Sequence, residues 1–127
     1  MNAEIPTHKT HFEWDTPKAK ANLKKHRVSF ETATRVFADP FAITTQDRIE
    51  DGEYRWQTLG MVDGVVLLLV AHTLQEVEDG GELIRIISAR RADPKEKRNY
   101  EKANHIFFST SNPKANLFPA SAYVHAM

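Results

Sequence analysis

Four apolar segments, separated only by short turn sequences, constrain the fold of this chain more than any other feature. The segments are Phe41–Thr45, Tyr54–Leu59, Val65–Thr73 and Leu83–Arg90, and the turn sequences are Asp51-Gly52, Asp63-Gly64 and Asp79-Gly80-Gly81. Asp-Gly pairs favour the tight turns of β-hairpins. Because no segment between these strands is long enough for the helix of a parallel crossover, the block predicts an antiparallel β-meander.

The segment before this block predicts a short strand and a helix. The strand is expected at His11–Trp14. Asp15-Thr16-Pro17 then combines a capping side chain with a proline suited to a first helical turn. The helix is expected to run to His26, with Ala19, Leu23 and His26 spaced for one face and lysines elsewhere.

Two further helices complete the predicted fold. Ser29 can cap one that ends at Asp39-Pro40, and Asp93-Pro94-Lys95-Glu96 has the pattern of a capping box. Tyr100 and Phe107 continue the apolar face of this last helix. The fold class is therefore α+β: an antiparallel β-meander with two N-terminal helices and a closing C-terminal helix.

A chain of 127 residues is expected to form one domain. We expect an N-terminal extension over residues 1–10, a folded domain over 11–108 and a tail over 109–127. The chain has no cysteine, so disulfides and thiolate metal sites are excluded. No segment has the apolar length of a membrane span and none resembles a secretory signal, so we expect a cytoplasmic protein without a membrane partner.

The charge of the chain is balanced overall but clustered locally. Seventeen basic residues match seventeen acidic ones, and neutrality argues against a nucleic-acid binder unless charge is segregated. One basic block covers 18–27 and another 85–98, while acidic residues gather at 50–53 and 76–82. Such separation suits a surface that binds a polyanion, and it is also typical of solvated helix faces.

An arginine inside an apolar strand is the strongest single indication of function. Arg85 lies within Leu83–Ala92, and strict alternation would place it on the face opposite Arg90 unless a β-bulge intervenes. Burying a guanidinium is costly unless an anion meets it. Arg85 therefore indicates either an internal salt bridge or a phosphate-binding group.

Several ordered segments resemble the BrnT family of bacterial toxins, which are ribonucleases of type II toxin–antitoxin pairs with a compact RelE-like fold. The segments are Phe12-Glu13-Trp14-Asp15, Asn22 with Lys25-His26, Val28-Ser29-Phe30-Glu31, Phe37 with Asp39-Pro40, Glu53 with Arg55, Ile84–Arg90, and Tyr100-Glu101. The sequence departs from the family at Arg27, where glycine is usual, and at Lys97, where arginine is usual. Nothing beyond Lys102 matches the family.

The resemblance implies a metal-independent endoribonuclease with no cofactor. In such an enzyme the 2′-hydroxyl of RNA attacks the adjacent phosphate, so a base, an acid and cations are required. The implied catalytic residues are His26, Lys25, Glu53, Arg55 and Arg85; the implied RNA contacts are Arg90, Arg91, Lys18 and Thr73. The chain offers no compact array of His, Asp and Glu with metal-ligand spacing.

Each of these residues also has a structural interpretation. His26 could transfer a proton or be a cation at a helix C-terminus, and Lys25 could be simply solvated. Glu53 and Arg55 share a strand face, where a base beside a guanidinium and a cross-strand salt bridge look alike. His72 fits a hydrogen-bonded core histidine better than a catalytic one. Trp14 and Trp56 fit the core better than an RNA surface; Tyr54 could stack on a base.

The resemblance also implies partners. We expect an RNA substrate and a small antitoxin, BrnA-like with a ribbon-helix-helix fold, in a 2:2 assembly that contacts DNA only through the antitoxin. An alternative is a catalytically silent toxin relic that binds nucleic acid or protein together with an antitoxin at DNA. A third interpretation is a small-molecule enzyme that holds a carboxylate or phosphate with its arginines.

Overall fold

The computed structural model describes residues 9–78 and 80–104. In chain order the elements are β1 (Thr10–Glu13), α1 (Thr16–His26), α2 (Phe30–Ala33), the 3-10 helix η1 (Thr34–Ala38), β2 (Ile43–Glu50), β3 (Glu53–Val62), β4 (Val66–Glu76), β5 (Glu82–Arg91) and α3 (Pro94–Asn104). The α+β class and the predicted order of helices and strands are confirmed. Phe107 and the predicted tail 109–127 lie outside the described residues.

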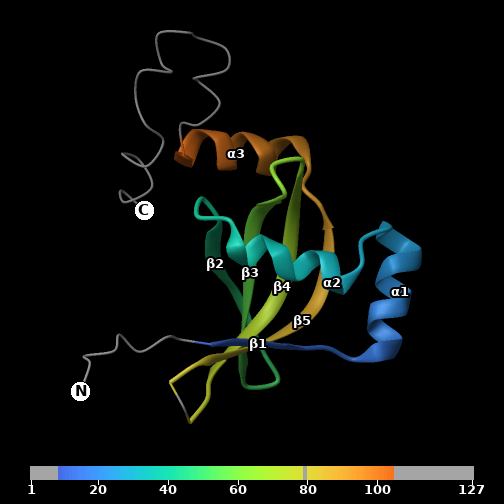
Figure 1. Ribbon diagram of the computed structural model, residues 1–127, viewed down its shortest axis with the longest axis vertical. Coiled ribbons are helices and arrows are strands. Elements are labelled where there is room, and N and C mark those ends of the chain that lie inside the picture. The colour runs from blue at the N-terminus through green and yellow to red at the C-terminus, as the bar shows by residue number, and fades with distance from the viewer. Residues whose placement is uncertain (1–8, 79, 105–127) are drawn as a thin grey trace, which may run out of the picture.

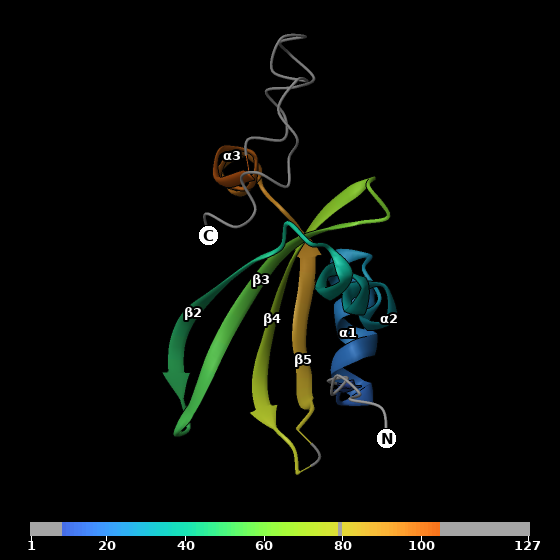
Figure 2. The same cartoon turned by 60° about the vertical axis from the view of Figure 1, so that its left-hand side comes forward.

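The five strands form one sheet in the order β1-β5-β4-β3-β2. β2 to β5 make the predicted antiparallel meander, whereas β1 pairs with β5 in parallel, which the sequence did not indicate. α1, α2 and η1 cover one face of the sheet, and α3 lies across one end of it (Figures 1 and 2). The other face carries no helix along most of its length, and we call it the open face.

The core lies between the sheet and the helices that cover it. Val28, Phe30 and Val36 contribute from the helical side, and Leu68, Val70, Ile84, Ile86 and Ala89 from the sheet. Trp14 packs against this core with its ring edge to Phe30, as predicted. No helix among the described residues is long and apolar enough to span a membrane.

The predicted start of α1 is confirmed, but the prediction for Leu23 is wrong. Asp15 caps the helix by accepting a hydrogen bond from the Lys18 amide (3.1 Å). Leu23 is 48% exposed, and the residue buried against the sheet is Asn22 instead. Arg27 follows the helix in the left-handed conformation (φ 61°), where a side chain costs about 1 kcal/mol relative to glycine.

Asn22 is buried because its carboxamide completes the edge of β5. Its Oδ1 accepts from the Ala89 amide (3.1 Å), and its Nδ2 donates to the carbonyls of Ala89 (2.8 Å) and Val28 (3.0 Å). β1 pairs with β5 only as far as Arg85, so Ala89 has no strand beside it on this edge. A side chain thus replaces the missing strand where α1 crosses.

A β-bulge in β5 overturns the face assignment expected from strict alternation. His72 of β4 pairs with Ile86 and Ala71 pairs with Ser88, which leaves Ile87 as the extra residue. Ala89 therefore faces the core, and Arg90 shares the open face with Arg85. Bulges re-aim side chains in this way.

Candidate functional site

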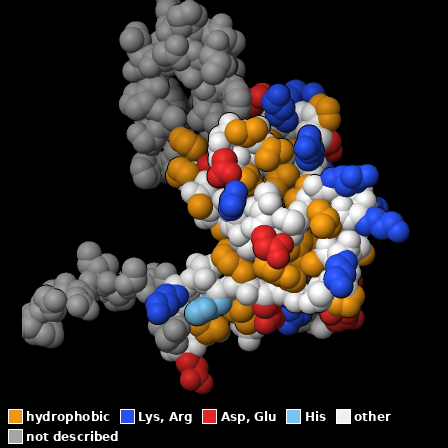
Figure 3. Space-filling model, turned by 45° about the vertical axis from the view of Figure 1, so that its right-hand side comes forward, with side chains coloured by type: hydrophobic (Ala, Val, Ile, Leu, Met, Phe, Trp, Pro, Cys, Tyr) orange, Lys and Arg blue, Asp and Glu red, His pale blue; other side chains and the backbone are white. Residues whose placement is uncertain are grey.

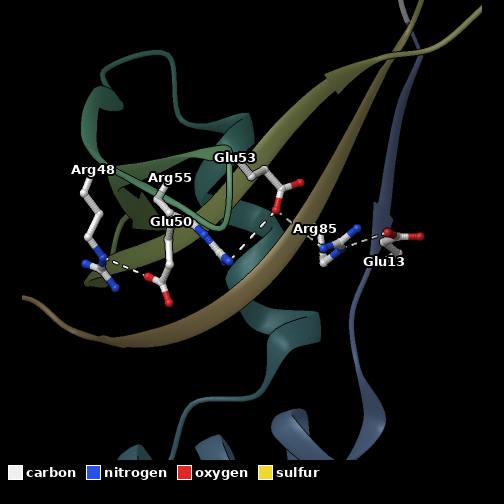
Figure 4. A network of polar contacts seen from close by, with 6 residues as sticks. All are labelled: Glu13, Arg48, Glu50, Glu53, Arg55 and Arg85. Atoms are coloured by element: carbon white, nitrogen blue, oxygen red, sulfur yellow. Dashed lines mark hydrogen bonds and ion pairs between the residues drawn. The ribbon is translucent and has the colours of Figure 1, made fainter.

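The centre of the candidate site is the Glu53 carboxylate on the open face. Its Oε1 lies 3.9 Å from Arg55 Nη2 and 3.9 Å from Arg85 Nη1 (Figure 4). These three residues come from the starts of β3 and β5, which are not neighbours in the sheet. The structure thus places together one carboxylate and two of the guanidinium groups predicted from the sequence.

Arg85 is held from a second side by Glu13. Its Nε donates to Glu13 Oε2 at 3.1 Å, across the parallel pairing of β1 with β5. Arg85 and Glu13 are each almost half exposed, so solvent screens the pair and it contributes little to stability. Its main effect is to orient the Arg85 guanidinium along the open face. Sequence analysis did not select Glu13, although it lies in the segment Phe12–Asp15 that matched the family.

Arg55 differs from Arg85 in its burial. Its side chain is only 16% exposed, and its Nε is buried without a hydrogen-bond partner among the described residues. An unpaired buried donor costs free energy, and the group recovers that cost when an acceptor reaches it. Arg55 therefore has a buried donor that an incoming acceptor could satisfy.

β3 and β4 stop pairing beside this cluster. Their ladder ends at Trp56 and His72, although β3 begins at Glu53 and β4 continues to Glu76. Figure 2 shows the two hairpins spreading apart below this point. Thr73, predicted to contact RNA, lies on this part of β4, pairs with Arg85 and is 4% exposed.

Lys18 lies beside the cluster, at the N-terminal end of α1. It lines a shallow hollow of ≈ 420 Å³ together with Glu13, Trp14, Asp15 and Arg85. Lys18 itself is exposed. The structure therefore adds one ammonium group to the two guanidinium groups, on the side of the cluster away from Arg55.

Lys25 and His26 are placed at the opposite end of α1 from Lys18. Helical rise puts the two ends of this eleven-residue helix about 15 Å apart along its axis. Lys25 is exposed and His26 is partly buried. Both belong to the basic last turn of α1 rather than to the Glu53 cluster. Figure 3 shows Lys and Arg side chains spread over this side of the molecule.

Arg90 shares the open face with Arg85, but its guanidinium is already paired. Nη1 and Nη2 donate to the two carboxylate oxygens of Glu96 at 2.9 and 2.8 Å. These hydrogen bonds lower the pKa of Glu96 and raise that of Arg90. The capping box predicted at Asp93 and Glu96 is present at the start of α3. Because Glu96 belongs to that first turn, its pairing with Arg90 anchors α3 to β5. Arg91 is exposed on the other face of the strand.

His72 is a buried, fully hydrogen-bonded residue of the core face, as predicted. Its Nε2 contacts Thr58 Oγ1 (2.7 Å), Nδ1 contacts the Thr73 carbonyl (3.1 Å), and the Phe37 ring meets it edge-on. Burial lowers the pKa of the imidazole, and the hydrogen bond to the Thr73 carbonyl opposes this only partly. His72 therefore remains neutral in the folded protein near pH 7.

The family motif residues Asp39 and Tyr100 have a structural role. Asp39 Oδ2 accepts from the Tyr100 hydroxyl (2.6 Å) and the Met61 amide (2.8 Å), and Oδ1 accepts from the Phe41 amide (2.9 Å). Burial, followed by the bond to Asp39, raises the pKa of the Tyr100 hydroxyl. Within the described part of the chain, no three His, Asp or Glu side chains are grouped closely enough to hold a metal ion.

Fold and site together define a small α+β domain with a carboxylate–guanidinium cluster on a largely uncovered sheet face. The family model of "Ribonuclease toxin, BrnT, of type II toxin-antitoxin system" matches residues 14–96, and the chain therefore belongs to the BrnT family. Membership makes it a ribonuclease toxin of the type II class, with an RNA substrate and an antitoxin partner.

Comparison with solved structures gives a match to the ribonuclease toxin BrnT of Brucella abortus. The two share 20% sequence identity, and the match covers 68% of this chain and 99% of that one with a TM-score of 0.45. A comparison with curated protein sequences finds no match.

Proposed function

We propose that this chain is a metal-independent endoribonuclease whose cleavage site is the Glu53, Arg55 and Arg85 cluster. The observation that carries the proposal is the position of one carboxylate between two guanidinium groups on the open face. Guanidinium forks match the oxygen geometry of phosphate, and a carboxylate can accept a proton. The cluster thus offers the base and the cations that RNA cleavage by an internal hydroxyl requires.

In the proposed reaction the RNA supplies its own nucleophile. Glu53 accepts the proton of a 2′-hydroxyl as its oxygen forms a bond to the adjacent phosphorus. Arg55 and Arg85 stabilise the charge that grows on the phosphorane oxygens. The bond from phosphorus to the 5′-oxygen then breaks, and that oxygen takes a proton as it leaves. The products are a 2′,3′-cyclic phosphate and a 5′-hydroxyl end.

Two residues are candidates for the acid that protonates the 5′-oxygen. Lys18 is favoured by position, because it lines the same hollow as Arg85. His26 is favoured by chemistry, because an imidazole is the side chain that most often transfers a proton in general acid–base catalysis. If His26 transfers the proton, His26→Gln flattens one limb of the pH–rate profile, whereas Lys18→Gln leaves both limbs in place.

The remaining predicted residues would contact RNA away from the scissile phosphate. Lys25 and Arg91 are exposed, and Thr73 lies on the part of β4 that no longer pairs with β3. Arg90 contacts RNA through its Nη atoms only if it releases Glu96. We further propose that the antitoxin is BrnA-like, with a ribbon-helix-helix fold. The complex would contain two copies of each chain and would contact DNA only through the antitoxin. The toxin would act in the cytoplasm on RNA that the cell needs for growth.

The test of the mechanism is RNA cleavage by the purified, antitoxin-free chain in excess EDTA. We expect cleavage to persist and the new ends to be 2′,3′-cyclic phosphate and 5′-hydroxyl, read by phosphatase sensitivity and kinase labelling. Loss of cleavage in EDTA with recovery in Mg²⁺ overturns the metal-independent mechanism, and 5′-phosphate products overturn attack by the 2′-hydroxyl.

One observation favours the second candidate function, a silent toxin relic that works through its antitoxin. Both guanidinium groups face carboxylates, so the cluster of Glu13, Glu53, Arg55 and Arg85 has no net formal charge toward a phosphate. This candidate predicts no cleavage in any buffer, together with unimpaired binding of the antitoxin. The same assay therefore separates it from the enzyme.

A further inference from the structure

Three large apolar side chains are exposed at the end of the sheet where the two hairpins finish. Ile49, Tyr54 and Leu74 are 58%, 54% and 38% exposed. Ile49 pairs with Tyr54, and Leu74 pairs with the buried core residue Ile84. Trp56 and His72 are pairing partners; Tyr54 lies two residues before Trp56, and Leu74 lies two residues after His72. Because alternate residues of a strand share a face, Tyr54, its partner Ile49 and Leu74 all lie on the helix-bearing face.

This exposed row continues the core face beyond the part that the helices cover. His72 lies two residues nearer the centre of β4 than Leu74, and its partner Trp56 lies two residues nearer the centre of β3 than Tyr54. Phe37 of η1 contacts His72, and among the described residues the packed core on β3 and β4 ends at this level. Two other large apolar side chains of the described chain are comparably exposed, Leu23 on α1 and Val65 in the β3–β4 turn. Within residues 9–78 and 80–104, only the hairpin ends combine several such side chains on one face.

An unneutralised pair of carboxylates lies beside this row. Glu76 and Glu82 are cross-strand partners, exposed, and on the same face as Leu74 and Ile84. Like charges directly opposite each other destabilise a sheet. In the described chain no Lys or Arg pairs with either of them, whereas the comparable pair Glu50 and Glu53 is met by arginines.

We propose that Ile49, Tyr54, Leu74, Glu76 and Glu82 form the docking surface for the antitoxin, and we call them the hairpin-end surface. The occupant is a segment that inserts apolar side chains over Tyr54 and Leu74 and places a Lys or Arg between Glu76 and Glu82. Two residues along a strand span about 7 Å, so the apolar and basic groups of the partner are separated by a similar distance. The identity of the partner rests on the proposed function.

Charge selects this occupant over the others that the surface could meet. RNA is repelled, because its phosphates would face Glu76 and Glu82. A second copy of this chain could offer Leu23 among the lysines of α1, but such a head-to-tail contact is not self-complementary and would build a ring or an open chain of copies rather than a simple pair. A protein segment with apolar and basic side chains satisfies both parts of the surface at once.

Docking there also accounts for inhibition. Tyr54 lies between Glu53 and Arg55 in the sequence of β3, so a segment that holds the ends of the two hairpins constrains the strands that carry the cleavage site. The unpaired ends of β3 and β4 are fixed relative to each other when the gap between them is bridged. RNA access to Glu53 and Arg85 is reduced without a contact to either.

The experiment measures the affinity of this chain for the small protein encoded by the adjacent reading frame. An apolar variant combines Ile49→Thr, Tyr54→Thr and Leu74→Thr, because threonine is polar yet β-branched and therefore suited to a strand. A charge variant combines Glu76→Lys and Glu82→Lys, which reverses the sign of the charge at both positions but keeps the repulsion between the two side chains. The matched controls are Leu23→Gln on α1 and Glu31→Lys on α2, both exposed.

We expect each hairpin-end variant to weaken binding at least about tenfold while both controls bind as the parent does. Loss of affinity in a control alone, equal loss in all variants, or no loss in the hairpin-end variants overturns the proposal. Thermal melting verifies that every variant is folded. Concentration-dependent assembly of the chain alone, removed by Leu23→Gln and by the apolar variant alike, assigns the surface to a second copy instead.

RNA cleavage by the antitoxin-free variants separates this inference from the proposed function. A parent chain that binds the partner through the hairpin-end surface but never cleaves RNA contradicts the ribonuclease mechanism alone. A chain that cleaves RNA and binds the partner elsewhere contradicts the docking surface alone.

Discussion

Arg85 and Arg90 show how one strand gives two arginines different roles. They share the open face because of the bulge at Ile87, yet Arg90 is bound by both oxygens of Glu96 while Arg85 meets Glu53 at 3.9 Å. A sequence shows the two guanidinium groups but not what each contacts. Their partners, Glu96 and Glu53, come from different elements, and only the folded chain distinguishes an anchor from a candidate phosphate ligand.

The sharpest residue-scale prediction concerns Arg85→Lys. Lysine keeps the charge but loses the planar pair of donors, so we expect RNA affinity to be largely retained and single-turnover cleavage to fall by about 10²–10³. Because Arg85 is 45% exposed, the melting temperature should change little. Arg90→Lys is the matched control: it should lower the melting temperature and spare the cleavage rate. A folded Arg85→Lys protein with parental rate removes Arg85 from the site.

His72 makes the stability of the fold depend on pH. Burial lowers its folded-state pKa, whereas the unfolded chain binds the proton near pH 6.5. Below that pH the unfolded state takes up more protons, so the stability that the neutral imidazole provides above pH 6.5 is lost as pH falls toward its folded pKa. We expect the melting temperature to fall between pH 7 and 5 more steeply in the parent than in His72→Gln.

The exposed His11 supplies the control for this measurement. His11→Gln should leave the slope of melting temperature against pH as it is in the parent. An unchanged slope in His72→Gln assigns the acid sensitivity to other groups.

At the scale of elements, local signals predicted more than long-range ones. Asp15, Ser29 and the Asp93–Glu96 box act through hydrogen bonds within a few residues, and the helices begin where they indicate. The bulge, the parallel pairing of β1 and the exposure of Leu23 depend on distant neighbours. In the same way, Glu53 and Arg55 could be identified from the sequence because they lie on one strand. Glu13 could not be identified as the second carboxylate beside Arg85, because that contact depends on the pairing of β1 with β5.

Gly60 fixes how closely η1 approaches the sheet. A methyl group there would lie 2.9 Å from both the Cβ and the carbonyl oxygen of Val36. Backbone cannot rotate away as a side chain can, so we expect Gly60→Ala to lower the free energy of unfolding by about 1–3 kcal/mol. Gly52→Ala is the comparison, since its Cβ would meet open space and only its positive φ carries a cost. Chemical denaturation of both variants measures the difference, and an equal loss would show that η1 moves freely.

At the scale of the whole molecule, neutrality conceals two separated regions of charge. Lysines cover α1 and carboxylates cluster at the hairpin ends, so one chain can present different surfaces to RNA and to protein. Composition alone counted against nucleic-acid binding. The arrangement in space removes that objection, because binding depends on local potential rather than on net charge.

The corresponding prediction is that the saturated complex with the antitoxin is silent. We expect light scattering to give the mass of two copies of each chain and cleavage assays to find no activity, with activity returning when the antitoxin is removed by proteolysis. Full ribonuclease activity in the saturated complex contradicts neutralisation by binding. A complex with one copy of each chain contradicts the 2:2 assembly alone.

The parallel pairing of β1 with β5 has a consequence for the order in which the protein folds. The hairpins of β2 to β5 join residues near in sequence, whereas Glu13 and Arg85 are 72 positions apart. Contacts of high sequence separation close large loops and tend to form late. Arg85 therefore receives its orienting carboxylate only when the first strand docks on the last, so a chain still emerging from the ribosome lacks the finished form of the proposed cleavage site.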